Sequence, residues 1–115
     1  MKIKPIKLHI NDLDAVVNFT VDKLEFDYEN HTKSMSILIK ESFHLRTMSG
    51  QMETVVFKMK DNCVYIDILA GGGGKGLLNL DFGSENLSVS SILNVLQEFA
   101  TERNVEMEFV DSLNI

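Results

Sequence analysis

The sequence predicts an α+β fold: a mainly antiparallel, curved β-sheet of about six or seven strands packed on one helix in the C-terminal half. One observation is a single long segment, Leu87–Asn104, in which apolar residues recur with the 3.6-residue period of an amphipathic helix. The other is that most of the remaining chain alternates apolar and polar residues, as strands with one wet face do. An amphipathic helix must bury its apolar stripe, so we expect the sheet to cover it.

The helical segment carries its own start and stop signals. Its apolar stripe consists of Val89, Ile92, Leu93, Leu96, Phe99 and Ala100, continued by the stem of Arg103. Ser88 is the expected N-cap, because its hydroxyl can accept a hydrogen bond from a free backbone N–H of the first turn. Asn104 is the expected stop, because asparagine tolerates the left-handed conformation that is common just past a helix end.

The N-terminal segment Lys2–Ile10 predicts the first strand. Its apolar face is formed by Ile6, Leu8 and Ile10. Pro5 cannot donate to a β-ladder, so the beginning of this strand is expected at an edge of the sheet or outside it. Asn11 is a candidate cap for a short helical turn over Leu13, Val16 and Val17.

A first hairpin is expected next. Its first strand runs from Phe19 to Glu29, with Leu24, Phe26 and Tyr28 on one face. The turn Asn30–Lys33 leads to a second strand, whose apolar face is formed by Met35, Ile37 and Ile39. Phe43–Met48 continues or bends into another short strand, and Ser49–Gln51 is expected to turn the chain.

A second hairpin has the best-determined register in the sequence. Asp61–Asn62 fits a two-residue loop that pairs Lys60 with Cys63. Three apolar pairs then share one face: Met59 with Val64, Phe57 with Ile66, and Val55 with Ile68. A shift of one residue would turn this apolar set outward. Leu77–Phe82 and Val105–Phe109 are expected as further strands.

Composition and charge limit the class of protein. The 115 residues, 44% of them apolar, predict a single domain, 1–115, without the long apolar runs of a membrane helix or secretory signal. The single cysteine, Cys63, cannot form an internal disulfide, which favours a reduced, cytoplasmic location. The net charge of −6 argues against direct nucleic-acid binding and suits a basic protein partner, although many soluble domains are mildly acidic.

A glycine-rich segment is the first candidate site. It consists of Gly71, Gly72, Gly73, Gly74, Lys75 and Gly76. The spacing matches that of phosphate-binding loops, but we expect a strand rather than a helix after it, and no Ser or Thr follows Lys75 to bind Mg²⁺. The simplest interpretation is a hairpin loop without a ligand. The alternative is a flap that contacts an anion or a peptide.

No motif in the sequence indicates a metal or catalytic site. His9, His31 and His44 are scattered without metal-ligand spacing, and Cys63 has no second cysteine, so we expect no metal, no cofactor and no enzymatic activity. A dyad of Cys63 with His44 stays open, since such pairs meet in space rather than in sequence. A half-buried cysteine and ordinary surface histidines are the simpler interpretation.

An acidic row is the second candidate site. It consists of Asp22, Glu25, Asp27 and Glu29. The last three would project from one face of the predicted strand at intervals of about 7 Å. A row of like charges would favour a partner that presents Lys and Arg side chains. The alternative is a solvated face that prevents edge-to-edge aggregation.

In its size, its acidity, its α+β pattern and its lack of a catalytic constellation, the chain resembles the immunity proteins that bacteria encode beside secreted toxins, including contact-dependent growth inhibition systems. The resemblance implies a non-catalytic inhibitor that neutralises a cognate toxin, such as a nuclease, by occluding a basic active site. In that hypothesis the acidic row is the binding surface, and its charge speeds the encounter.

Two further hypotheses stay open. One is a small-ligand-binding protein or enzyme, in which Gly71–Gly76 closes over an anionic ligand and His44 and Cys63 are the candidates for chemistry. The other is a structural module that forms a homodimer through an exposed strand.

Overall fold

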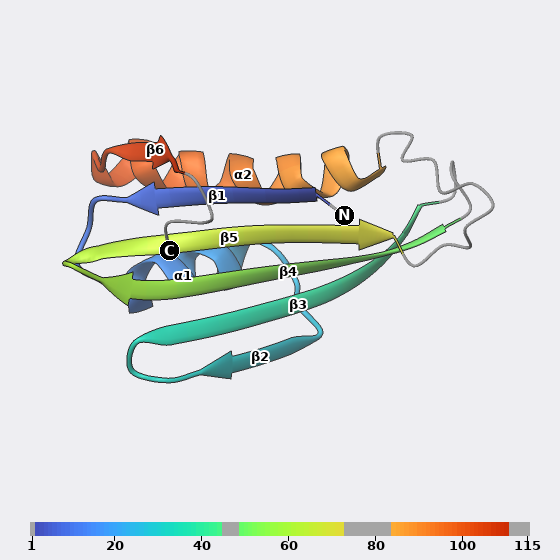
Figure 1. The fold of residues 1–115 in the computed structure, drawn as a ribbon, viewed down its shortest axis with the longest axis horizontal. Helices are drawn as coiled ribbons and strands as arrows, with labels where there is room; N and C mark the ends of the chain where they lie inside the picture. Colours follow the sequence, from blue (N-terminus) through green and yellow to red (C-terminus); the bar gives the residue numbers. More distant parts are fainter. Residues whose placement is uncertain (1, 45–48, 73–83, 111–115) are drawn as a thin grey trace.

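The chain folds into two helices and six strands, seen in a computed structural model that describes residues 2–44, 49–72 and 84–110. In chain order the elements are β1 (Lys2–Leu8), α1 (Leu13–Lys23), β2 (Tyr28–His31), β3 (Met35–His44), β4 (Ser49–Lys60), β5 (Cys63–Gly72), α2 (Ser84–Arg103) and β6 (Met107–Phe109). The strands form one antiparallel sheet in the order β2-β3-β4-β5-β1-β6 (Figure 1). The predicted α+β class with an antiparallel sheet is confirmed.

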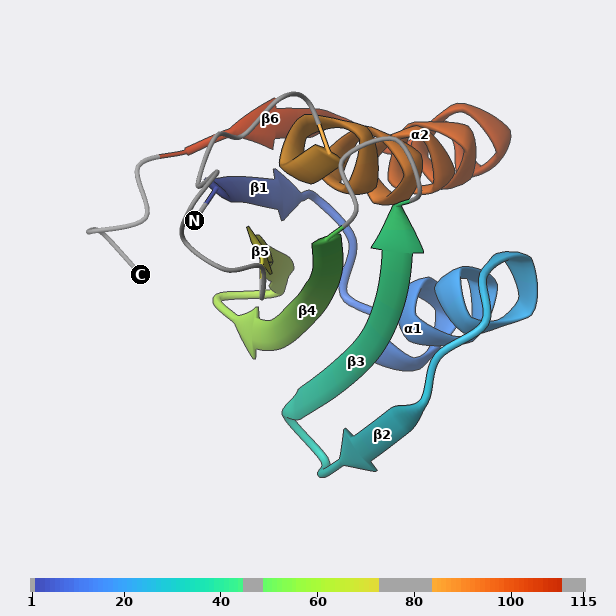
Figure 2. The same ribbon diagram turned by 90° about the vertical axis from the view of Figure 1, so that its right-hand side faces the viewer.

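Both helices lie on one face of the sheet (Figure 2). They also contact each other: the rings of Phe19 on α1 and Phe99 on α2 meet edge to face, with centroids 5.4 Å apart. The fully buried side chains come from the helices and the central strands, among them Ile6, Leu8, Val16, Val55, Phe57, Val64, Ile66, Ile68 and Leu96. Each such side chain contributes about 1.5–3 kcal/mol through burial, so this one-sided core is the main source of stability.

Helix α1 is the largest departure from the predicted fold. The segment predicted as a short helical turn is an 11-residue helix. Asp12, rather than Asn11, is its N-cap: Oδ1 of Asp12 accepts a hydrogen bond from the backbone N–H of Ala15 at 3.1 Å. A carboxylate at this position also meets the positive end of the helix dipole. The sheet is therefore covered by two helices, where the sequence predicted one.

The predicted strand from Phe19 to Glu29 is consequently wrong. Its first half belongs to α1, its middle connects α1 to β2, and only its last two residues lie in β2. The helical period was hidden because Thr20, a polar residue, occupies a fully buried position of α1. Its hydroxyl donates to the carbonyl oxygen of Val16 at 2.9 Å, which satisfies it inside the core.

The β4–β5 hairpin has the predicted register at every pair. Phe57 lies opposite Ile66, and both are fully buried. The connecting residues Asp61 and Asn62 have φ angles of 52° and 62°. Two consecutive residues with positive φ are the signature of the two-residue turn whose twist matches that of the strands. The prediction of this hairpin is confirmed.

The face of β3 that packs against the helices is opposite to the predicted one. Leu38 and Ser36 are buried there. The side chains predicted as the apolar face lie on the other side and are partly buried: Met35, Ile37 and Ile39. Leu38 pairs with Val55, a core residue of β4, and cross-strand partners share a face. Because both faces of β3 carry apolar residues, alternation alone did not distinguish them.

The start of β4 also differs from expectation. The predicted turn at Ser49–Gln51 is wrong, because these residues form the first part of β4 and pair with the end of β3. The predicted strand Phe43–Met48 falls partly on β3 and partly outside the described residues. The predicted strand Leu77–Phe82 lies wholly outside the described residues.

Helix α2 starts earlier than predicted and ends where predicted. It begins at Ser84, so Ser88 lies inside the helix and is not its N-cap. Ile92, Leu96, Phe99 and Ala100 of the predicted stripe are buried, and Leu93 is partly buried, whereas the side chain of Val89 lies outside the described part of the chain. Asn104 has a φ of 56°, which confirms it as the left-handed residue that ends the helix.

Strand β1 lies between β5 and β6, but β6 pairs only with its second half, Ile6–Leu8. Within the described residues, the first half of β1 therefore has a strand on one side only, which agrees with the edge position expected for Pro5. The Pro5 carbonyl accepts from the backbone N–H of Val110 at 3.2 Å, on the side away from β5. No helix in the described ranges is both long and apolar enough to cross a membrane.

Replacing Asn62 by glycine should stabilise the fold by about 0.5–1 kcal/mol, because glycine adopts a positive φ without steric cost. Asn62→Val should destabilise it by about 1–2 kcal/mol, since a β-branched side chain is strained at that φ. Chemical denaturation of both variants measures the two effects. Equal stability of the two variants would contradict the left-handed turn.

Candidate functional site

The face of the sheet opposite α1 and α2, called the open face below, is covered by no helix in the described part of the chain (Figure 2). Its residues follow from the strand registers, since cross-strand partners point to the same side. One row across the sheet consists of Tyr28, Ile39, Thr54, Leu69 and Ile3. The next row consists of Asn30, Ile37, Val56, Asp67 and Pro5. These two rows, called the apolar rows, run from β2 to β1.

The apolar rows end in side chains that are unusually exposed for their size. Ile3 is 48% exposed and Tyr28 is 49% exposed, at opposite ends of one row. Met52, on the same face of β4, is 46% exposed. Partly buried Ile39 and Leu69 lie between these ends, so apolar side chains extend along the row. Apolar area of this kind on one face is characteristic of surfaces that bind a partner. The open face is therefore the first candidate site.

Asp67 is the one charged residue within the two apolar rows. It lies directly between Val56 on β4 and Pro5 on β1. Its Oδ1 atom is shielded from water and has no hydrogen-bond partner among the described residues. Burial raises the pKa of Asp67 above its ordinary value, and the positive charge of Lys58 acts in the opposite direction without cancelling the effect. Asp67 as a whole is only half-buried, so the accessible part of its carboxylate is a position at which a partner can supply a donor.

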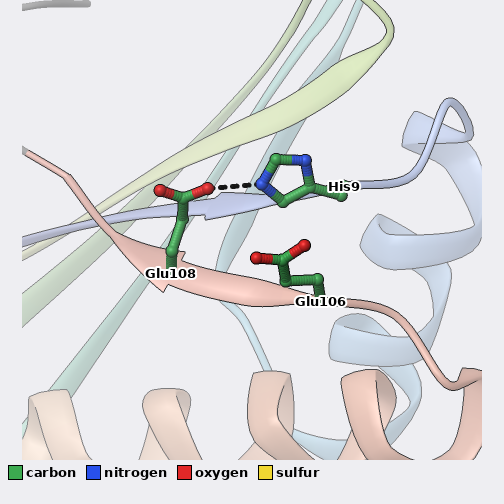
Figure 3. Close-up of side chains that lie close together, drawn as sticks. All are labelled: His9, Glu106 and Glu108. Atoms are coloured by element: carbon green, nitrogen blue, oxygen red, sulfur yellow. Dashed lines mark hydrogen bonds and ion pairs between the residues drawn. The ribbon is translucent and has the colours of Figure 1, made fainter.

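A second cluster, called the polar corner, lies at the edge of the sheet where β1 ends and β5 and β6 begin. It consists of His9, Cys63, Glu106 and Glu108. Nε2 of His9 contacts Oε2 of Glu108 (Figure 3), and Nδ1 of His9 lies 3.8 Å from Sγ of Cys63. The hydrogen bond with His9 lowers the pKa of Glu108, and the nearby charge of Lys7 adds to this effect.

Backbone pairing holds the polar corner together. Leu8 pairs with Met107 on β6, and the backbone N–H of the next residue, His9, donates to the carbonyl of Glu106 at 3.0 Å. Glu106 and Glu108 are two positions apart, so strand alternation puts both on the side of the sheet that His9 faces (Figure 3). Imidazole and carboxylate groups placed in this way can hold a proton or a divalent cation.

The acidic row predicted from the sequence does not exist as a row. Asp22 lies in α1, Glu25 and Asp27 lie in the connection to β2, and Glu29 lies in β2. All four are exposed, but they do not share a strand face, because the predicted strand is largely helix and loop.

Two members of that set also have contacts within the chain. Oδ2 of Asp27 accepts from the backbone N–H of Glu41 at 2.8 Å, and Glu29 pairs with His31 at 3.0 Å. Of the four, only Asp22 and Glu25 have side chains that make no hydrogen bond or ion pair with other described residues. The role of the four residues in binding a partner stays a prediction.

The glycine-rich segment and the dyad of Cys63 with His44, both considered from the sequence, have different outcomes. Gly71 and Gly72 form the end of β5, whereas Gly73–Gly76 with Lys75 lie outside the described residues. The dyad of Cys63 with His44 does not form: His44 pairs with the first residue of β4 and Cys63 with the last. These ends are about 36 Å apart along a strand that rises roughly 3.3 Å per residue. The histidine beside Cys63 is His9.

Sequence reasoning missed the polar corner for a physical reason. His9 and Glu108 are 99 positions apart, and only the pairing of the first strand with the last brings them together. Asp67 did have a signal, because the predicted β4–β5 register already placed it beside Val56 on the face away from the core. Comparison with known proteins adds no further assignment: no protein-family model, no curated protein and no solved structure matches this chain.

Replacing Asp67 by asparagine should flatten the pH dependence of stability. Because burial raises the pKa of Asp67 above the ordinary value of 3.8, the folded chain binds more protons than the unfolded chain between these two pKa values. The contribution of Asp67 to the unfolding free energy therefore falls as the pH rises through this range. At pH 7 Asp67→Asn should be more stable by about 0.5 kcal/mol or less, since water screens a partly exposed charge.

Denaturation of parent and variant at pH values from about 3 to 7 measures this difference. It should be largest at neutral pH and disappear at acidic pH, where both states of the parent are protonated. Asp22→Asn, which removes one exposed carboxylate from α1, is the matched control. A variant of Asp67 that is less stable than the parent at pH 7 would show that the carboxylate is satisfied in the folded chain.

Proposed function

We propose that this chain is a non-catalytic, cytoplasmic binding protein that docks a basic protein partner on the open face of its sheet. The single observation that carries the proposal is the Asp67 carboxylate, which is half-buried inside the two apolar rows and has no hydrogen-bond partner among the described residues. The exposed side chains of Ile3, Tyr28 and Met52 supply the apolar contact area around it.

The charge of the partner follows from the cost of covering Asp67. A partner that buries the apolar rows also removes the remaining water from this carboxylate, which is unfavourable unless a donor replaces it. An Arg or Lys side chain satisfies both the charge and the hydrogen bond. The net charge of −6 supports the same choice, because it attracts a basic protein and accelerates its encounter.

Inhibition of a toxin is the setting that fits a small acidic binding protein with these features. Nucleases carry basic clefts that bind phosphate groups, and an acidic protein seated over such a cleft excludes the substrate. The resemblance to bacterial immunity proteins supports this setting. The surface differs from the one expected from the sequence, since the open face replaces the acidic row as the main contact.

Asp67→Lys should abolish protection in a survival assay. The assay expresses the C-terminal domain of the large protein encoded directly upstream in a sensitive host and counts colonies with and without this chain. Calorimetry with the purified domain should show binding weakened by about 30-fold or more, as for other central interface charges. Asp22→Lys is the matched control, because it changes the net charge equally from an exposed position on α1.

Asp67→Asn keeps the shape of the side chain and should also weaken binding, so a loss of affinity cannot be ascribed to misfolding of the lysine variant. Thermal melts of both variants check the fold. If Asp22→Lys and Glu25→Lys abolish binding and Asp67→Lys does not, the interface is the acidic surface and the open face is the wrong assignment. A domain that is harmless, or that kills equally with and without this chain, would contradict the inhibitor function.

A further inference from the structure

We propose that the polar corner is a binding site for one first-row divalent cation such as Zn²⁺, with His9, Glu106 and Glu108 as its protein ligands. One ligand atom from each of these residues lies within 4.8 Å of the other two. The site is separate from the apolar rows and does not depend on the proposed partner.

The positions of the three groups suit a cation of this class. Zinc binds imidazole nitrogen and carboxylate oxygen at about 2.0–2.2 Å, so ligand atoms of a tetrahedral site lie roughly 3.3–3.5 Å apart. Closing a spacing of at most 4.8 Å to this value requires the ligand atoms to move by about an ångström, a distance that side-chain rotations can supply. An imidazole ligand favours Zn²⁺ and its neighbours over Mg²⁺ and Ca²⁺, which prefer oxygen ligands alone.

The charges of the cluster favour binding of a divalent cation. Glu106 and Glu108 direct two carboxylates toward one imidazole (Figure 3). Glu108 pairs with His9, whereas the Glu106 carboxylate makes no hydrogen bond or ion pair within the described residues. A divalent cation neutralises both carboxylates, which a singly charged imidazolium cannot do. The ligands are accessible: the side chains of His9 and Glu108 are 34% and 44% exposed.

Cys63 is assigned as a positioning residue and not as a ligand. Its Sγ lies 3.8 Å from Nδ1 of His9, the ring nitrogen that faces away from Glu108. Contacts to the second nitrogen of a metal-binding histidine fix the orientation of the ring. Lys7 weakens the site, because its positive charge lies near Glu108, although Nζ stays 5.4 Å above the ring centroid of Tyr65. We therefore expect moderate affinity.

Titration of Zn²⁺ into the chelator-treated full chain should show one bound ion per molecule by calorimetry. His9→Gln and Glu106→Gln should each weaken binding by at least about tenfold, as expected for lost ligands. His31→Gln is the matched control, because His31 also pairs with one glutamate, Glu29, at 3.0 Å and with similar exposure, but has no second carboxylate assigned to it. Thermal melts without metal establish that each variant is folded.

Cobalt(II) substitution tests the donor set. Nitrogen and oxygen ligands give only weak visible bands, whereas a thiolate ligand adds intense charge-transfer absorption in the near ultraviolet. We expect the weak bands alone, and Cys63→Ser should retain the ion with reduced affinity. Intense charge-transfer bands that Cys63→Ser removes would overturn the assigned ligands. Absence of Zn²⁺ binding, or equal loss in His9→Gln and His31→Gln, would overturn the site.

Discussion

The pairing of β4 with β5 is the interaction on which the rest of the structure depends. The left-handed residues Asp61 and Asn62 set which residues lie opposite each other. A shift of β5 by one residue would move Ile66 to the open face and Asp67 under the helices. Loss of apolar burial and a buried charge both oppose that shift. β1 adds to β5 in a matching register, which places Pro5 beside Asp67 and leads His9 toward Cys63.

Because both helices cover the same face, the two faces of the sheet differ in burial and composition. Both helices pack on the same face, and their contact through Phe19 and Phe99 completes a continuous core. An antiparallel sheet with one covered face normally alternates apolar and polar residues along each strand. Here the second face is apolar in its centre and polar at one end. This composition is more typical of a surface that binds another protein than of one that stays exposed to water.

The two candidate sites differ in how the fold supports them. Asp67 lies on a central strand, between two other strands, so its position is as rigid as the core behind it. The polar corner lies where β1 ends and β5 and β6 begin. Strand pairing positions its backbone, and its exposed side chains contact each other only through His9. Such a corner can adjust its side chains to a small ion, whereas the flat rows around Asp67 present area to a larger molecule.

By itself the sequence determined the α+β class, the C-terminal helix with its stop at Asn104, and the β4–β5 register, because these depend on local period and turn chemistry. Only the tertiary structure decided the length of α1, where buried Thr20 interrupts the apolar period, and the core face of β3, which is apolar on both sides. It also separated Cys63 from His44 and joined His9 to Glu108, 99 positions away. The pairing of strands far apart in sequence leaves no local pattern, because the residues around each partner show only the alternation of their own strand.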